Sequence, residues 1–291
     1  MGIQSAVEMT YQNFEIHPVS PTVGSEIVGL DLSQPLSEAV AQELQDAWHD
    51  RLVLFFRDQD LTEAQFKTFA KIFGEIEIYP FIRKTATEPE VERLDVETTP
   101  AQAPPTTMLH IDMSSFAVPS KAALLYAVDV PDAGHDTIWA SMYAAYDALS
   151  ESMQEFLLGK SALNLSLDVA TRDLFMRAGP DGPEKFARFI KAPPAEHPLV
   201  HTHPDTGRRA LFVDPLRMWS ISGLHWDESQ ALIGLLSNHV NKPEFQCRCH
   251  WRPGTLAVWD NRCTLHKRVD DPVATRTMFR LPIAGTAPPT L

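Results

Sequence analysis

Strand patterns and helix patterns alternate along the first third of the chain. Apolar residues occupy every second position in FEIHPV (14–19) and SEIVGLDL (25–32), which predicts two strands with one buried face. Residues 37–51 instead place apolar side chains four apart, the spacing of an amphipathic helix. This part of the chain therefore combines short strands with helices that cover them.

A second strand and helix pair follows directly. LVLFF (52–56) is a continuous apolar run, typical of a strand that is buried on both faces. Residues 61–74 carry a stripe of three phenylalanines, with Thr62 as the predicted N-cap and Gly74 as the predicted stop. We interpret this stripe as core packing.

Strand patterns dominate the rest of the chain. Strands are predicted at 122–130, 209–214, 245–251, 254–261 and 276–285, a strand that runs into a helix at 136–149, and helices at 150–160 and 226–242. Residues 160–200 give no clear pattern. These elements predict a mainly β protein with surrounding helices, a sandwich or barrel, and one domain over 1–291.

Residues 83–108 differ from their surroundings. They are rich in Thr, Pro and Glu and poor in apolar residues, apart from a strand pattern around Val91 to Val96. We expect a long loop here, and long loops in compact domains are often active-site lids.

Composition excludes several classes of protein. The net charge of −13 argues against binding to nucleic acid, which needs Lys and Arg to neutralise phosphates. Three cysteines provide no disulfide framework and suit a reducing compartment. The N-terminus has no signal-peptide pattern, and no apolar run approaches the roughly 18 residues of a membrane span. We therefore expect a cytoplasmic protein.

Three residues could bind a metal ion. In a strand, His110 and Asp112 would project from the same face, because side chains two apart point the same way. This pair alone is a weak signal, and a structural pair, in which Asp112 contacts a surface group, is the more common explanation. With His266 as a partner it gives two histidines and one carboxylate, the facial triad of non-haem Fe(II) oxygenases.

Two arginines near the C-terminus suggest anion binding. Arg276 and Arg280 share one face of a predicted strand, about 13 Å apart at roughly 3.3 Å per residue. Facing a barrel interior, each would need an anion, such as a carboxylate or a sulfonate. Facing outward, both would simply be solvated, and the pattern alone leaves that alternative open.

Together these motifs resemble one family. His-x-Asp, a second His preceded by WDNRCTL, an Arg ten residues later and HDTIWASMYAAYDALS all resemble the taurine dioxygenase / 2,4-dichlorophenoxyacetate dioxygenase (TauD/TfdA) family. The resemblance covers nearly the whole chain. It implies a double-stranded β-helix (a jelly roll, cupin-like) and an enzyme dependent on Fe(II), 2-oxoglutarate and O2.

The resemblance also implies roles for individual residues. His110, Asp112 and His266 would be the iron ligands. Thr137 would hydrogen-bond 2-oxoglutarate, Arg276 would bind its distal carboxylate, and Trp251 would lie close to it.

Substrate contacts follow from the same resemblance. Arg280 would hold the anionic end of the substrate, a carboxylate, sulfonate or sulfate. Tyr79 stands where taurine-type members have a His, which indicates a substrate other than taurine. His135 replaces a common Gly beside the co-substrate turn, and the 83–108 loop would be the family's mobile lid.

The implied reaction is hydroxylation of a small anionic molecule, with C–O or C–S cleavage or desaturation as variants, giving succinate and CO2. A non-catalytic binding protein on the same fold and a zinc hydrolase remain as alternatives. The resemblance also implies a homo-oligomer. His201 and His203 could share a strand face and hold a second metal, although the resemblance favours a scaffold role for this segment.

Overall fold

A computed structural model describes five parts of the chain, namely residues 11–78, 88–96, 108–164, 194–269 and 275–291. Within these parts, none of the helices has the length and apolarity needed to cross a bilayer.

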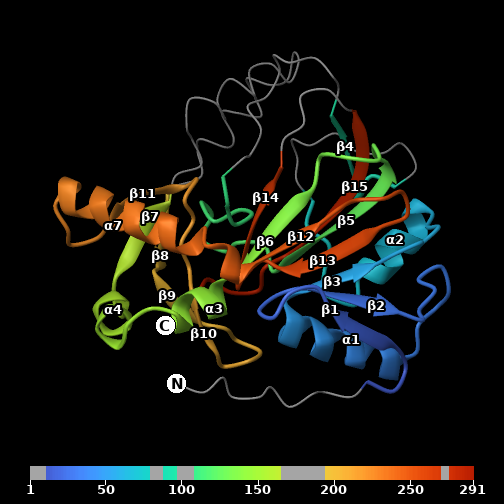
Figure 1. Ribbon diagram of the computed structural model, residues 1–291, viewed down its shortest axis with the longest axis horizontal. Helices are drawn as coiled ribbons and strands as arrows, with labels where there is room; N and C mark the ends of the chain where they lie inside the picture. The colour runs from blue at the N-terminus through green and yellow to red at the C-terminus, as the bar shows by residue number, and fades with distance from the viewer. Residues whose placement is uncertain (1–10, 79–87, 97–107, 165–193, 270–274) are drawn as a thin grey trace.

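The largest element is a seven-stranded sheet (Figure 1). Its strands, in spatial order, are β1 (Glu15–Pro18), β2 (Ser25–Val28), β3 (Val53–Phe56), β13 (Leu256–Asp260), β5 (Ala122–Asp129), β15 (Arg276–Ile283) and β4 (Glu92–Val96). All neighbours are antiparallel except β2 and β3. Strands that are far apart in sequence are therefore adjacent, as in a jelly roll.

The described residues form three smaller sheets as well. The first contains β12 (Gln246–Cys249), β6 (Thr137–Ser141) and β14 (Thr264–Arg268); the second contains β11 (Met218–Ile221), β7 (Ser161–Asn164) and β8 (Ala195–Pro198); the third contains β10 (Arg209–Leu211) and β9 (Val200–Thr202). Phe55 of β3 packs edge-on against Trp139 of β6, with 5.4 Å between ring centroids. The large sheet therefore faces the β12–β6–β14 sheet across an aromatic core.

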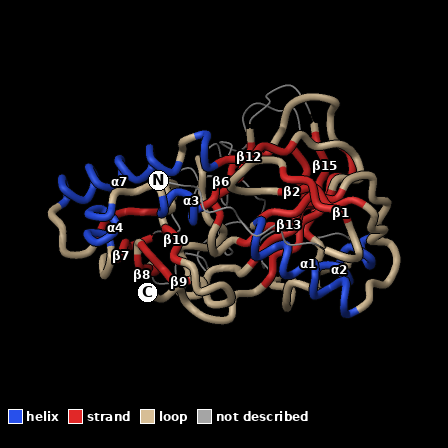
Figure 2. The backbone as a smooth tube through the Cα atoms, turned by 60° about the horizontal axis from the view of Figure 1, so that its bottom comes forward, coloured by secondary structure: helices blue, strands red, loops and turns tan. Residues whose placement is uncertain are grey.

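Helices cover the outside of this β structure. They are α1 (Glu38–Arg51), α2 (Glu63–Ala70), α3 (Met142–Asp147), α4 (Glu151–Leu157), α7 (Trp226–Val240) and the 3-10 turn η1 (Pro243–Phe245). Figure 2 shows α1 and α2 at one end of the molecule and α4 and α7 at the other end beside β7 to β10, while α3 lies nearer the middle, next to β10. The predicted mainly β architecture with surrounding helices is confirmed.

Strand β3 is apolar throughout because both of its faces are buried. Val53 and Phe55 point into the core between the sheets, while Leu54 and Phe56 point toward α1 and α2. All four side chains are fully buried, because successive residues of a strand face opposite sides. Each such side chain contributes about 1.5–3 kcal/mol of burial free energy.

Most predicted elements are present, with shorter bounds. Thr62 is the N-cap of α2, as predicted, and it also forms a capping box with Gln65, but the helix ends at Ala70 and not at Gly74. The strand predicted at 25–32 is limited to β2, and the strand pattern inside the 83–108 loop is β4. Apart from residues 88–96 and 108, that loop lies outside the described residues, as does Tyr79.

Candidate metal centre

A two-residue bridge brings the histidines together. His110 and His266 form an isolated antiparallel bridge, and each backbone N–H donates to the other's carbonyl at 3.0 Å. Their rings lie side by side, with 4.2 Å between centroids. Since β14 carries His266, this bridge fixes His110 at the edge of the β12–β6–β14 sheet.

Asp112 reaches the same point through a turn. The sequence predicted a strand for His110 and Asp112, and this local prediction is wrong: beyond the bridge at His110 the chain turns, with Met113 in the left-handed region at a φ of 58°. Asn261 holds the turn from both sides. Its Oδ1 accepts from the Asp112 N–H at 2.9 Å, and its Nδ2 donates to the Asp112 carbonyl at 2.9 Å.

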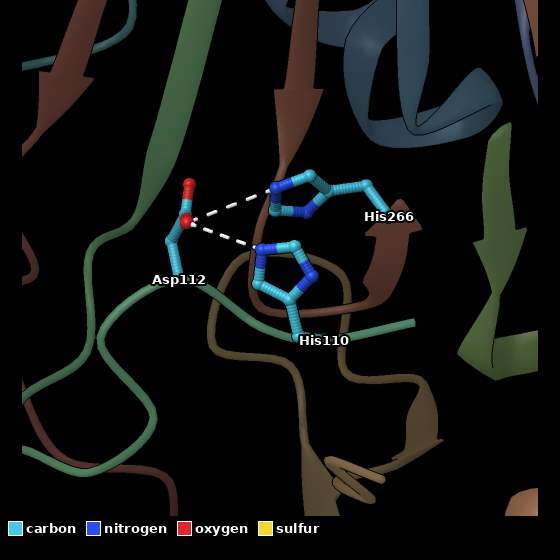
Figure 3. Close-up of side chains that lie close together, drawn as sticks. All are labelled: His110, Asp112 and His266. Atoms are coloured by element: carbon cyan, nitrogen blue, oxygen red, sulfur yellow. Dashed lines mark ion pairs between the residues drawn. The ribbon is translucent and has the colours of Figure 1, made fainter. Parts of the chain in front are cut away.

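The three side chains converge on one point (Figure 3). Asp112 Oδ1 lies 3.9 Å from His110 Nε2 and 3.7 Å from His266 Nε2, and the three ligand atoms lie within 4.8 Å of one another. These separations are longer than hydrogen bonds. They suit an ion held about 2.0–2.2 Å from each atom, which spaces neighbouring ligand atoms by roughly 3–4 Å. The donor set therefore fits a divalent metal.

Charge states at the centre favour metal binding. Burial would raise the pKa of Asp112, but Arg280 and the two histidines outweigh it and hold that pKa well below its usual range. Burial, with the neighbouring His110, lowers the pKa of His266 to about 3. An ionised carboxylate and a neutral imidazole are the forms that ligate a metal.

Three residues predicted to bind 2-oxoglutarate lie together. The indole N–H of Trp251 donates to Thr137 Oγ1 at 3.0 Å, and Arg276 Nη1 donates to the carbonyl of His135 at 3.1 Å. Arg276 is buried, so its guanidinium faces the protein interior, where a charge needs polar or charged partners. His135 adopts the left-handed conformation, with a φ of 53°, at the position where the resemblance in sequence implies a common Gly.

Arg280 faces inward, which decides the alternative left open by the sequence. Its Nη2 donates to Asp112 Oδ2 at 2.6 Å, and its Nη1 lies 3.5 Å from Oε2 of Glu92. Arg276 and Arg280 therefore share the inner face of β15. Because Arg280 engages Oδ2, Asp112 is left with Oδ1 directed toward the histidines.

Residues 15–281 match the family described as "Taurine catabolism dioxygenase TauD, TfdA family". The chain belongs to this family. As a TauD/TfdA member it is an oxidoreductase, an Fe(II)- and 2-oxoglutarate-dependent dioxygenase that consumes O2. The jelly-roll fold predicted from the sequence is the fold of this family.

Curated relatives and solved structures agree with this membership. An alpha-ketoglutarate-dependent sulfate ester dioxygenase of Pseudomonas putida is 33% identical, covering 94% of this chain and 90% of the relative. A 2,4-dichlorophenoxyacetate dioxygenase of Cupriavidus pinatubonensis is 31% identical, covering 86% of this chain and 90% of the relative. The crystal structure of a taurine dioxygenase from Burkholderia xenovorans superposes with a TM-score of 0.80 at 31% identity, covering 95% of this chain and 93% of that one.

A second cluster of potential ligands is a hydrogen-bonded scaffold in this TauD/TfdA chain. His203, Asp260 and Cys263 are close enough to hold a metal. However, His203 Nδ1 accepts the N–H groups of the 205–206 turn, which leaves Nε2–H to donate to Asp260 at 3.0 Å. Arg262 also binds Asp260, with Nη2 2.6 Å from Oδ2. Asp260 is thus already hydrogen-bonded by two partner residues, His203 and Arg262.

Sequence reasoning missed three functional side chains near the metal centre. Asn261 clamps Asp112, and the buried Asp214 accepts from the Ile111 N–H at 3.1 Å and from Ser114 Oγ at 2.5 Å. Glu92 is the third, through its contact with Arg280. Asn261 lies inside the quoted WDNR motif, so only its role was missed. Asp214 and Glu92 carried no local signal, because their partners are distant in sequence.

His201 makes stability depend on pH. Its Nε2–H donates to the carbonyl of Arg262 at 2.7 Å, and burial lowers its pKa to about 4 from 6.5. The unfolded chain therefore binds the proton first, and the free energy of unfolding falls as pH drops from about 6.5 to about 4. We expect His201 to contribute a loss of about 2 kcal/mol between pH 7 and pH 5.

Urea unfolding of the wild type and of His201→Gln at several pH values measures this contribution. Glutamine can still donate to the Arg262 carbonyl but does not titrate. Between pH 7 and pH 5, the free energy of unfolding of the variant should fall by about 2 kcal/mol less than that of the wild type. Equal pH slopes for the two proteins would contradict the prediction.

Proposed function

We propose that His110, Asp112 and His266 bind Fe(II), with Thr137, Arg276 and Trp251 holding 2-oxoglutarate beside it, and that residues 1–291 form one catalytic domain. The convergence of the three ligand atoms, with an ionised carboxylate and a neutral buried imidazole among them, carries this proposal. Non-haem Fe(II) oxygenases use this set of ligands and keep positions open for a co-substrate.

Iron and 2-oxoglutarate, when bound, supply the oxidising chemistry that uses O2 to functionalise a C–H bond and yields succinate and CO2. The chain supplies position and charge. Arg280 holds Asp112 Oδ2, so the carboxylate offers a single oxygen, Oδ1, toward the histidines. Arg276 and Thr137 orient the co-substrate, and their burial keeps water away from it.

The substrate we propose is a small anionic organic molecule that binds at Arg280. Two observations support it: Arg280 faces the metal centre, and the relatives are named for sulfate esters and for a phenoxyacetate. Hydroxylation of a carbon next to oxygen or sulfur would release the heteroatom group, and desaturation is the other variant. Tyr79 as a substrate contact and the 83–108 lid stay predictions, as do a homo-oligomer and a cytoplasmic location.

Anaerobic titration with Fe(II) and 2-oxoglutarate tests the metal centre. We expect a visible metal-to-ligand charge-transfer band in the wild type, because the keto acid chelates the iron. His266→Ala should lose the band, since a ligand is removed. The matched control is His239→Ala: His239 is as buried as His266, at 8% exposed, but it lies on α7, and its Nε2 donates to the Ala145 carbonyl of α3.

The outcomes separate the alternatives. A band in the wild type and the control that is missing in His266→Ala supports the dioxygenase site. Absence of the band in fully metallated wild type would favour the non-catalytic binding protein. A band that survives in His266→Ala would mean that another residue completes the ligand set.

A further inference from the structure

A buried carboxylate lies beside the arginine proposed to bind the substrate. Glu92 of β4 stands directly opposite Arg280 of β15 in the antiparallel ladder, so the two side chains share one face of the sheet. Glu92 is 1% exposed, and its Oε2 lies 3.5 Å from Arg280 Nη1. The other arm of the guanidinium, Nη2, binds Asp112 at 2.6 Å.

The charges around Arg280 therefore do not resemble those of a lone arginine. One guanidinium faces two carboxylates, those of Asp112 and Glu92. When a divalent metal takes up the charge of Asp112, the Glu92 carboxylate still lies next to the Arg280 guanidinium. An anionic group that approaches Arg280 is attracted by the guanidinium and repelled by the neighbouring Glu92 carboxylate.

We propose that Glu92 is a specificity-determining residue that acts through Arg280, by reducing the preference of the site for charged over uncharged substrate head groups. This proposal rests on the role of Arg280 given under "Proposed function". It deepens the substrate class: the head group is selected by hydrogen-bond geometry more than by net charge. Uncharged molecules of the same shape as an anionic substrate thus compete well with it.

The size of the effect follows from the separation of the charges. The Glu92 carboxylate and an anionic head group bound at Arg280 would be about 6 Å apart. At an effective dielectric constant of about 20, repulsion between two unit charges at this distance raises the dissociation constant of the anion roughly 100-fold. Partial exposure and water at the site reduce this, and we expect at least tenfold. Removal of the charge should strengthen anion binding, whereas a residue with a merely structural role would weaken binding or leave it unchanged when replaced.

The experiment compares two probes of one shape. Phenoxyacetate carries a charge and phenoxyacetamide does not. Each is titrated calorimetrically into the Fe(II)- and 2-oxoglutarate-loaded protein without O2, for the wild type, Glu92→Gln and Glu92→Asp. We expect Glu92→Gln to bind phenoxyacetate at least tenfold more tightly than the wild type, with phenoxyacetamide unchanged. Glu92→Asp keeps the charge and should resemble the wild type.

Other outcomes overturn the proposal. The proposal is wrong if folded Glu92→Gln binds phenoxyacetate no more tightly than the wild type, or if its binding is undetectable. It is also wrong if the affinity of Glu92→Gln rises equally for phenoxyacetate and phenoxyacetamide. Glu92→Met is the second uncharged variant, used if the glutamine variant does not fold. The same titrations without iron and 2-oxoglutarate give the ratio between variants even if the co-substrate does not bind, so failure of the dioxygenase site is distinguishable from failure of this inference.

Discussion

Asp112→Asn should reduce iron affinity by more than about 100-fold, and dioxygenase activity with it, while the protein stays folded. The carboxylate supplies the single negative ligand among the three proposed, and Oδ1 is the atom that faces both histidines. The backbone of residue 112 would remain clamped by Asn261, so the turn survives the substitution. Competition with a chromogenic chelator measures the iron affinity of the variant. A thermal melt shows whether the variant stays folded.

Asp214→Asn is the matched control for this prediction. Asp214 is also a buried aspartate next to the metal-binding turn, but it contacts the Ile111 N–H and Ser114 rather than the proposed metal position. Its replacement should loosen the turn and lower iron affinity by about 10-fold at most. If Asp112→Asn bound iron as tightly as the wild type, the proposed facial triad would be wrong.

The local elements of the fold were predictable because their signals are local. Ser37, Thr62 and Ser150 each cap the helix that follows, through a side-chain oxygen that accepts a backbone N–H three residues on. The continuous run in β3 follows from burial on both faces. Strands β8 and β9 were not predicted, because AEHP and VHT hold too few apolar residues to show an alternation of apolar and polar positions.

The site was predictable only as a set of residue types. The motif names His110, Asp112 and His266, but it does not reveal how they meet. The prediction placed His110 and Asp112 on a strand, whereas a bridge and a left-handed turn bring them together. This happens because Asn261, 149 residues away, supplies the backbone hydrogen bonds that a neighbouring strand would otherwise give.

Charge partners were the least predictable part. Glu92 lies 188 residues from Arg280 in sequence, and the contact depends on the register of β4 against β15. A shift of one residue would turn Glu92 to the other face of the sheet. The sequence could therefore propose an anion-binding arginine but not the carboxylate that moderates its charge.

Asp260→Asn is expected to lower the free energy of unfolding by about 3–5 kcal/mol, because it leaves a largely buried arginine without its main counter-charge. Asp260 is fully buried and accepts from His203, from both Nε and Nη2 of Arg262 and from the Arg262 N–H. Burial alone would raise its pKa, but Arg262 and His203 hold it well below the usual range. The carboxylate is therefore ionised, and asparagine cannot replace its charge.

Asp205→Asn provides the comparison that isolates burial. Asp205 binds Nη1 of the same Arg262 at 2.8 Å, but its side chain is 40% exposed, and an exposed pair contributes about 1 kcal/mol or less. Urea unfolding of both variants at pH 7 should give a loss several times larger for Asp260→Asn. Equal losses of unfolding free energy in the two variants would show that water can solvate Arg262 when either aspartate is replaced. A much larger loss of unfolding free energy for Asp260→Asn would show that the buried Asp260–Arg262 pair stabilises the WDNR segment. This segment leads into β14, the strand that carries His266.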